Sequence, residues 1–180
     1  DPVRTLPVRF NRLAAARRAG RSTDARDNRS CFPYTDIGRA GLDHLEQTVR
    51  ALPPTLAGDV ADVGVGRGGA GVFLRGCLVA HGQADRTLWV VDRFVATDPD
   101  QSSVDPADPL ARFRADLNQV RDAYARFDLL DEHVKFLIGP YDQSLVDPPV
   151  DRLALLRIGE SVGSSLDAVL RRHLPHVVTG

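Results

Sequence analysis

Residues 59–71, Asp-Val-Ala-Asp-Val-Gly-Val-Gly-Arg-Gly-Gly-Ala-Gly, decide how this chain folds. Residues 59–65 are predicted to form a buried strand that opens into a glycine turn, and a helix is predicted to follow. Glycine suits such a turn because its backbone reaches torsions that are closed to residues with a Cβ. It also lets a ligand approach the main chain closely. The order strand, glycine turn, helix predicts the first unit of a nucleotide-binding α/β sheet.

The alternation of strands and helices continues along the chain. We predict strands at residues 59–65, 87–91, 133–138 and 150–158, and helices at residues 37–52, 71–81, 110–127 and 165–174. The strand at 87–91, Thr-Leu-Trp-Val-Val, is nearly all apolar, as expected for a strand covered on both faces. This alternation predicts an α/β fold with a Rossmann-like, doubly wound parallel sheet and right-handed crossovers.

Acidic residues lie on both sides of the glycine turn. Asp62 precedes the first glycine, and Asp92 ends the second strand, where it could accept hydrogen bonds from ribose hydroxyls. Gly64, Gly66 and Gly69 fit the pattern GxGxxG. A dinucleotide would place its pyrophosphate at the helix N-terminus, but the Asp62 carboxylate would repel it and could receive the ammonium group of S-adenosylmethionine. The pattern favours S-adenosylmethionine, while a dinucleotide and a purely structural turn stay open.

Composition and charge exclude several classes of partner. The 180 residues suit one domain, with 43% hydrophobic and 26% charged residues and a net charge of −1. Such a charge gives no strong field toward nucleic acid or an anionic membrane, and no apolar run is long enough to span a bilayer. Cys31 and Cys77 form no CxxC pair. We expect a cytoplasmic protein with reduced thiols, a small-molecule partner and the option of a homo-oligomer.

Two regions differ in their patterning. Residues 1–33 are arginine-rich and weakly patterned, so we expect an N-terminal arm or lid, followed by a cofactor-binding domain over residues 34–180. Residues 97–109, rich in Asp, Pro and Ser, are expected to form a loop near the substrate. The chain contains no methionine and stops at Gly180, where the pattern approaches another strand. We therefore expect a fold that is truncated at its C-terminus.

Longer stretches of the sequence resemble the macrocin O-methyltransferase family, whose members methylate sugar hydroxyls of macrolides and related natural products. The matching stretches are residues 35–45, 58–82, 85–94, 120–131, 134–139 and 151–158. They occur in the same order as in the family, with few gaps. This resemblance implies a class I S-adenosylmethionine-dependent methyltransferase fold, with S-adenosylmethionine as the methyl donor.

The resemblance also implies roles for individual residues. Asp62, Gly64 and Gly69 would line the methionine end of the cofactor, and Asp92 would hold its ribose. The segment from Gly139 to Ser144 would lie near the adenine. Trp89 and Phe94 are expected in the core rather than in the pocket wall. The residues expected to bind the cofactor, including an N-terminal lid, are Thr35, Ile37, Asp62, Gly64, Gly66, Gly69, Asp92, Gly139 and Ser144.

The resemblance fails after the fourth strand. The family typically carries Asp-Gly-Asp-x-Tyr-x-Ser there, and the first aspartate binds magnesium together with two later aspartates. Residues 159–165 read Gly-Glu-Ser-Val-Gly-Ser-Ser here, so both aspartates and the tyrosine are absent. Magnesium prefers several oxygen ligands anchored by carboxylates, and a one-residue shift would turn Glu160 to the other face of the strand. We therefore predict no metal ligand, and magnesium is doubtful.

The expected function is an S-adenosylmethionine-dependent O-methyltransferase of the antibiotic-biosynthesis type, acting on a sugar or other hydroxyl of a natural product. Alignment supplies much of the rate in methyl transfer, and a general base could replace a metal. His133, His173 and His176 fall in no base motif, so no catalytic residue is assigned. The alternatives are a catalytically degenerate binding or scaffolding domain, and an enzyme with metal-independent chemistry.

Overall fold

A computed structural model describes residues 35, 37–94, 115–141 and 150–178 of the chain. Within these residues, one four-stranded sheet has the order β3-β2-β1-β4. All neighbouring strands are parallel. The strands are β1 (Asp59–Val63), β2 (Leu88–Asp92), β3 (Val134–Ile138) and β4 (Leu153–Ile158). The strand order reverses direction between β1 and β4, and ligands of open α/β sheets bind at the carboxyl ends of strands beside such a reversal.

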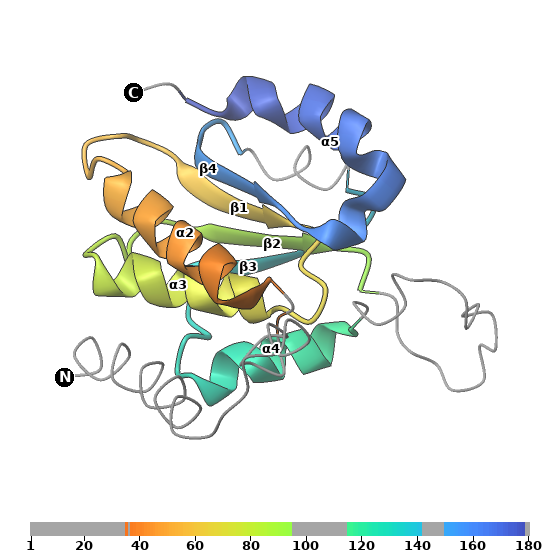
Figure 1. Ribbon diagram of the computed structural model, residues 1–180, viewed down its shortest axis with the longest axis horizontal. Helices are drawn as coiled ribbons and strands as arrows, with labels where there is room; N and C mark the ends of the chain where they lie inside the picture. Colours follow the sequence, from red (N-terminus) through yellow and green to blue (C-terminus); the bar gives the residue numbers. More distant parts are fainter. Residues whose placement is uncertain (1–34, 36, 95–114, 142–149, 179–180) are drawn as a thin grey trace.

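Helices cover both faces of the sheet (Figure 1). On one face lie α2 (Gly38–Ala51), α3 (Gly69–Ala80) and α4 (Leu117–Arg126). On the other face lies α5 (Leu166–His173), between the 3-10 turns η3 (Glu160–Ser165) and η4 (Leu174–His176). This arrangement confirms the predicted doubly wound α/β sheet.

The two central strands, β1 and β2, bury side chains on both faces, which explains their largely apolar sequence. Val60 and Val90 pack with residues of α3 and α4 in one core cluster. Ala61 and Val63 pack with Val169 of α5 in a second cluster. Successive residues of β1 therefore contribute to opposite layers, as the two-residue period of a strand requires.

Several predicted boundaries were wrong by a few residues. The first strand ends at Val63 rather than at residue 65, because Gly64 has a φ of 76° and leaves the strand conformation. The helix after the turn begins at Gly69 rather than at residue 71. The fourth strand begins at Leu153 rather than at residue 150. The last helix is preceded by η3, in which Gly163 has non-helical torsions, so α5 begins one residue late, at Leu166.

A capping box sets the start of α4. The Asp116 side chain accepts a hydrogen bond from the Gln119 backbone N–H at 2.8 Å, and the Gln119 side chain accepts one from the Asp116 backbone N–H at 3.3 Å. Such reciprocal bonds satisfy donors that a helix start leaves unpaired. The helix was predicted from residue 110, but residues 110–114 lie outside the described part of the chain.

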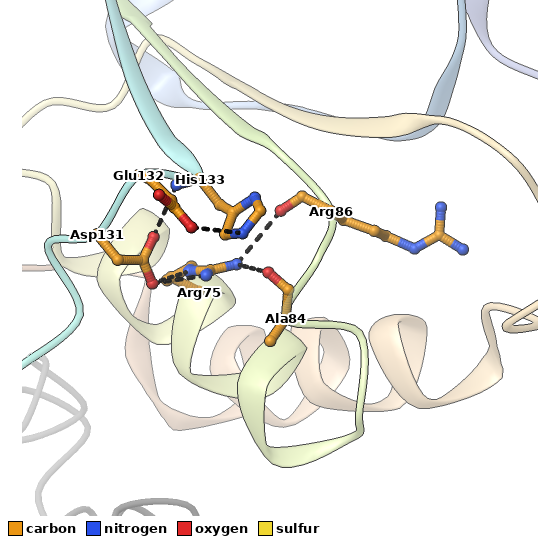
Figure 2. A network of polar contacts seen from close by, with 6 residues as sticks. All are labelled: Arg75, Ala84, Arg86, Asp131, Glu132 and His133. Carbon is orange, nitrogen blue, oxygen red and sulfur yellow. Dashed lines mark hydrogen bonds and ion pairs between the residues drawn. The ribbon is translucent and has the colours of Figure 1, made fainter.

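A buried arginine connects the segments that lead into the amino-terminal ends of β2 and β3 (Figure 2). The Arg75 side chain of α3 is 1% exposed, and its Nε and Nη2 donate to Asp131 Oδ2 at 3.2 and 2.6 Å. Its Nη1 donates to the carbonyl oxygens of Ala84 and Arg86 at 2.8 and 3.3 Å. These bonds connect α3 to the segments that enter β2 and β3.

Two of the predicted regions lie outside the described residues, namely the N-terminal arm at 1–33 and the loop at 97–109. Among the helices that the structure does describe, none combines the length and the apolar character needed to cross a membrane.

Candidate cofactor site

The glycine turn between β1 and α3 has the backbone conformation that its sequence predicts. Gly64, Gly66 and Gly68 have φ values of 76°, 55° and 83°, in the left-handed region that favours glycine. A Cβ on Gly64 would lie 2.5 Å from a methyl carbon of Val162, so η3 packs directly on the turn. The turn therefore presents backbone without side chains at Gly64, Gly66 and Gly68, at the carboxyl end of β1.

A cavity opens beside this turn. Its wall is formed by residues preceding α2, by the glycine turn, by the first turn of α3, and by the end of β4 with the start of η3. The lining residues are Thr35, Ile37, Gly64, Val65, Gly66, Arg67, Ala70, Arg157, Glu160 and Ser161. The structure thus brings four of the expected cofactor residues, Thr35, Ile37, Gly64 and Gly66, to one cavity, although they come from two distant segments.

Asp92 connects the end of β2 to the glycine turn through a hydrogen bond. Its Oδ2 accepts a hydrogen bond from the Gly66 N–H at 3.1 Å, and its Oδ1 accepts one from the Arg93 N–H at 2.7 Å. The hydroxyls of Tyr141 and Ser161 also donate to this carboxylate, at 3.2 and 3.4 Å. A carboxylate has about four lone-pair sites, so a ribose hydroxyl would have to share them with these donors. The ribose role of Asp92 stays a prediction.

Tyr141 was not identified from the sequence. Burial, followed by the negative charge of Asp92, raises the pKa of its hydroxyl to about 12. The hydroxyl is therefore protonated at neutral pH and available to donate to Asp92. The Arg93 guanidinium lies 5.2 Å from the centre of the Tyr141 ring, which places a cation beside the same group.

The acid before the first glycine lies behind the cavity wall. Asp62 of β1 is fully buried, and its register partner on β4 is Arg157. Arg157 Nη1 donates to Asp62 Oδ1 at 2.5 Å, and the Arg157 side chain is 14% exposed and lines the cavity. The ligand-facing charge here is therefore the arginine. Its sequence signal was a lone cation in the otherwise apolar strand Leu-Ala-Leu-Leu-Arg-Ile, which sequence reasoning did not use.

The second oxygen of Asp62 faces the interior of the protein. Asp62 Oδ2 and the Tyr124 hydroxyl are both buried, and neither has a hydrogen-bond partner within the described residues. A Cβ on Gly71 would lie 2.6 Å from Asp62 Oδ2 and 2.4 Å from the Tyr124 hydroxyl. Burial, and then the charge of Asp62, raises the pKa of Tyr124 well above its usual value. The absence of a side chain at Gly71 is what leaves room for these two polar groups.

The remaining predicted residues are dispersed. Gly69 is the first residue of α3, and the Gly139 N–H donates to the Asp92 carbonyl oxygen at 3.1 Å. Ser144 lies outside the described residues. Phe94 is in the core, edge-to-face with Phe136. Trp89 packs against the other core cluster, and its indole N–H donates to Asp59 Oδ2 at 2.9 Å.

The donor set at the cavity does not fit a divalent cation. Among the described residues that line it, Glu160 supplies the one carboxylate and shares the lining with Arg67 and Arg157. Magnesium would need several oxygen ligands, and the described part of the chain contains no group of three or more His, Cys, Asp or Glu side chains that could hold a metal.

The histidines do not supply an evident general base. The ring Nε2 of His173 lies 2.7 Å from the Tyr141 carbonyl oxygen, in a buried position. His133 Nε2 lies 3.8 Å from Glu132, near the start of β3, and His176 ends η4. As far as the described residues define the cavity, none of these three lines it, so no catalytic base is assigned.

Comparison with known proteins gives a consistent result. A family model described as macrocin O-methyltransferase (TylF) matches residues 6–180. Mycinamicin III 3''-O-methyltransferase of Micromonospora griseorubida is 34% identical over 171 residues, which cover 87% of this chain and 67% of that protein. Demethyldecarbamoylnovobiocin O-methyltransferase of Streptomyces niveus is 35% identical over 155 residues, 82% of this chain and 59% of the relative.

A third relative is named for methylation of a sugar. It is the 8-demethyl-8-(2,3-dimethoxy-alpha-L-rhamnosyl)-tetracenomycin-C 4'-O-methyltransferase of Streptomyces olivaceus, 33% identical over 155 residues, with 82% of this chain and 59% of that protein covered. The chain thus spans 59 to 67% of the length of these curated relatives.

The fold is also similar to a solved structure, that of the O-methyltransferase NovP. The TM-score is 0.74 at 30% sequence identity, and the match covers 98% of this chain and 80% of NovP. The parallel sheet and glycine turn therefore define a Rossmann-like methyltransferase fold. Since the family match extends over residues 6–180, the chain belongs to the macrocin O-methyltransferase family.

Proposed function

We propose that this chain carries out S-adenosylmethionine-dependent O-methylation of a sugar or similar hydroxyl on a natural product, of the kind made in antibiotic biosynthesis. The observation that carries the proposal is the bare glycine turn, which lines a cavity beside the reversal in strand order together with Thr35 and Ile37. Family membership and the three O-methyltransferase relatives support it. We further propose a cytoplasmic enzyme with small-molecule partners, and residues 1–33 as its N-terminal arm.

Methyl transfer mainly requires that the protein align the methyl donor with the acceptor hydroxyl. The bound methyl donor would supply a methyl group on an already activated sulfonium. Under this proposal the glycine turn admits the ligand close to the main chain. Asp92, held by the Gly66 N–H, presents its carboxylate at the end of β2. Holding donor and acceptor in line can supply a large part of the rate by itself, so we expect activity without a bound metal.

The second candidate is a methyltransferase-like domain that binds the cofactor without catalysis. One observation favours it: among the described residues that line the cavity, one carboxylate, Glu160, lies with Arg67 and Arg157, which does not fit metal-assisted activation of a hydroxyl. Both candidates require a cofactor pocket, so binding measurements test what they share and turnover separates them.

The decisive experiment is calorimetric titration of the chain with S-adenosylmethionine and S-adenosylhomocysteine, followed by methyl-transfer assays with demethylated glycosylated macrolides. We expect one site for each ligand, and methyl transfer that responds neither to magnesium nor to a chelator. Lack of binding by both ligands would contradict the proposal. Tight binding with no transfer to any acceptor would favour the binding-domain candidate.

Two glycine variants give a matched control for this titration. Gly64 and Gly82 both have positive φ, at 76° and 72°. A Cβ on Gly64 would collide with Val162, whereas a Cβ on Gly82 would meet nothing within 4 Å. Both Gly→Ala variants incur similar backbone strain, about 1–2 kcal/mol. We expect Gly64→Ala to weaken S-adenosylhomocysteine binding and Gly82→Ala to leave it unchanged.

A further inference from the structure

Arg157 contacts both a buried carboxylate, that of Asp62, and the cavity. Nη1 donates to Asp62 Oδ1 behind the cavity wall, and the residue lines the cavity itself. A guanidinium has five N–H donors, and within the described residues this bond to Asp62 is the hydrogen bond that Arg157 makes. Donors therefore remain for a group inside the cavity.

The buried pair fixes the position of this arginine. Asp62 is fully buried, so the ion pair holds Arg157 Nη1 in place at the boundary between core and cavity. A Cβ on Gly159 would lie 3.1 Å from Arg157 Nη1 and 2.0 Å from the Gly64 carbonyl oxygen. The guanidinium is thus close to the glycine turn, and bare backbone at Gly159 permits that approach. A positioned fork of N–H donors matches the two oxygens of a carboxylate.

The strand order indicates which end of the ligand reaches Arg157. Asp92 ends β2, and Arg157 lies near the end of β4, with β1 and its glycine turn between them. A nucleoside whose ribose is held at the end of β2 would cross the turn, and its amino-acid end would then approach β4. That end of S-adenosylmethionine carries a carboxylate.

We infer that Arg157 binds the carboxylate of the methionine end of the methyl donor, with Asp62 as the residue that positions it. This inference rests on the proposed function. It reverses the polarity expected from the sequence, in which Asp62 itself received the ammonium group of the ligand.

The test compares two ligands that share a nucleoside. S-adenosylhomocysteine carries the amino-acid end, whereas 5'-methylthioadenosine has the same thioether nucleoside without it. We expect the unmodified chain to prefer S-adenosylhomocysteine. Arg157→Met alone would leave the Asp62 charge buried and unpaired, so the main variant is Asp62→Asn/Arg157→Met, because replacing both partners of a buried pair is tolerated better than removing one.

In the double variant we expect S-adenosylhomocysteine to bind about 10- to 100-fold more weakly, the loss of one hydrogen bond to a charged group. Binding of 5'-methylthioadenosine should not change, which a general distortion of the pocket would not allow. Asp62→Asn alone keeps the arginine but removes the charge that positions it, so it should lose part of the preference. Arg157→Lys keeps the charge but loses the fork, so it should lose part of the preference. Asp167→Asn/Arg171→Met removes an exposed ion pair of α5 with the same zero change in net charge and should behave as the unmodified chain.

An unchanged preference in both Arg157→Lys and the double variant would overturn the inference and leave the proposed function intact. Failure of the unmodified chain to bind either ligand would overturn both. Circular dichroism and urea unfolding of each variant ensure that the comparison is made between folded proteins.

Discussion

Two arginine–aspartate pairs lie at opposite ends of the parallel strands, one where strands begin and one where strands end. They differ in which partner is buried. Arg75 and Asp131 meet where β2 and β3 begin, with the arginine 1% and the aspartate 39% exposed (Figure 2). Asp62 and Arg157 meet near the ends of β1 and β4, with the aspartate 0% and the arginine 14% exposed. The burial order of the two residue types is reversed.

This reversal separates a structural pair from a candidate recognition pair. All three nitrogens of the Arg75 guanidinium donate to protein oxygens, so that group has little left to offer a ligand. Arg157 bonds to Asp62 through Nη1 and lines a cavity, while Asp62 keeps a buried oxygen without a partner among the described residues. Buried polar groups that the fold leaves incompletely satisfied deserve a functional explanation, and here they lie at the edge where α/β sheets bind ligands.

The largest effect on stability is expected from Arg75→Met. The substitution leaves the carbonyl oxygens of Ala84 and Arg86 without this donor and removes the link from α3 to Asp131. We expect a loss of about 2–4 kcal/mol in the free energy of unfolding, measured by urea denaturation. S-adenosylhomocysteine affinity of the folded fraction should stay unchanged, because the pair lies at the edge opposite the cavity. A loss below about 1 kcal/mol would mean that the Arg75 pair is not structural, and the comparison would fail.

A smaller effect is expected from Gly71→Ala, which tests how tightly the protein packs behind Asp62. The new Cβ would lie too close to both Asp62 Oδ2 and the Tyr124 hydroxyl. Overpacking of this kind costs about 1–3 kcal/mol, so urea unfolding should show a loss in that range. Combining Gly71→Ala with Tyr124→Phe removes one of the two collisions and should restore part of the loss. If the stability changes of the two substitutions simply add, the Cβ at position 71 does not collide with the Tyr124 hydroxyl.

The smallest effect is expected from Tyr124→Phe alone. Because the hydroxyl has no hydrogen-bond partner within the described residues, its removal should change stability by less than about 1 kcal/mol near neutral pH. The pKa of Tyr124 is raised above 10.0 in the folded protein, so the folded state keeps a proton that the unfolded chain loses. Stability from this group is therefore complete below pH 10.0 and declines as the pH rises above it. Urea unfolding between pH 8 and 11 should show a weaker alkaline decline in Tyr124→Phe; an identical decline would argue against burial of this hydroxyl.

The order of the elements and the glycine turn were predictable from the sequence because they depend on local rules. Gly64, Gly66 and Gly68 adopt left-handed torsions that glycine favours. The apolar run of β2 predicted a strand covered on both faces, which is confirmed because Val90 and Val91 lie in different core clusters. Element ends were predicted less well, because contacts such as the η3 turn against Gly64 involve residues distant in the sequence.

The sequence by itself determined the fold class, the glycine turn and the position of the candidate cofactor cavity beside it. Only the tertiary structure decided the polarity of that cavity, because Asp62 and Arg157 are 95 positions apart and become neighbours through the pairing of β1 with β4. Likewise, Tyr141 reaches Asp92 from 49 positions away. Burial and charge pairing depend on which strands and helices meet in space, and no local sequence pattern specifies that.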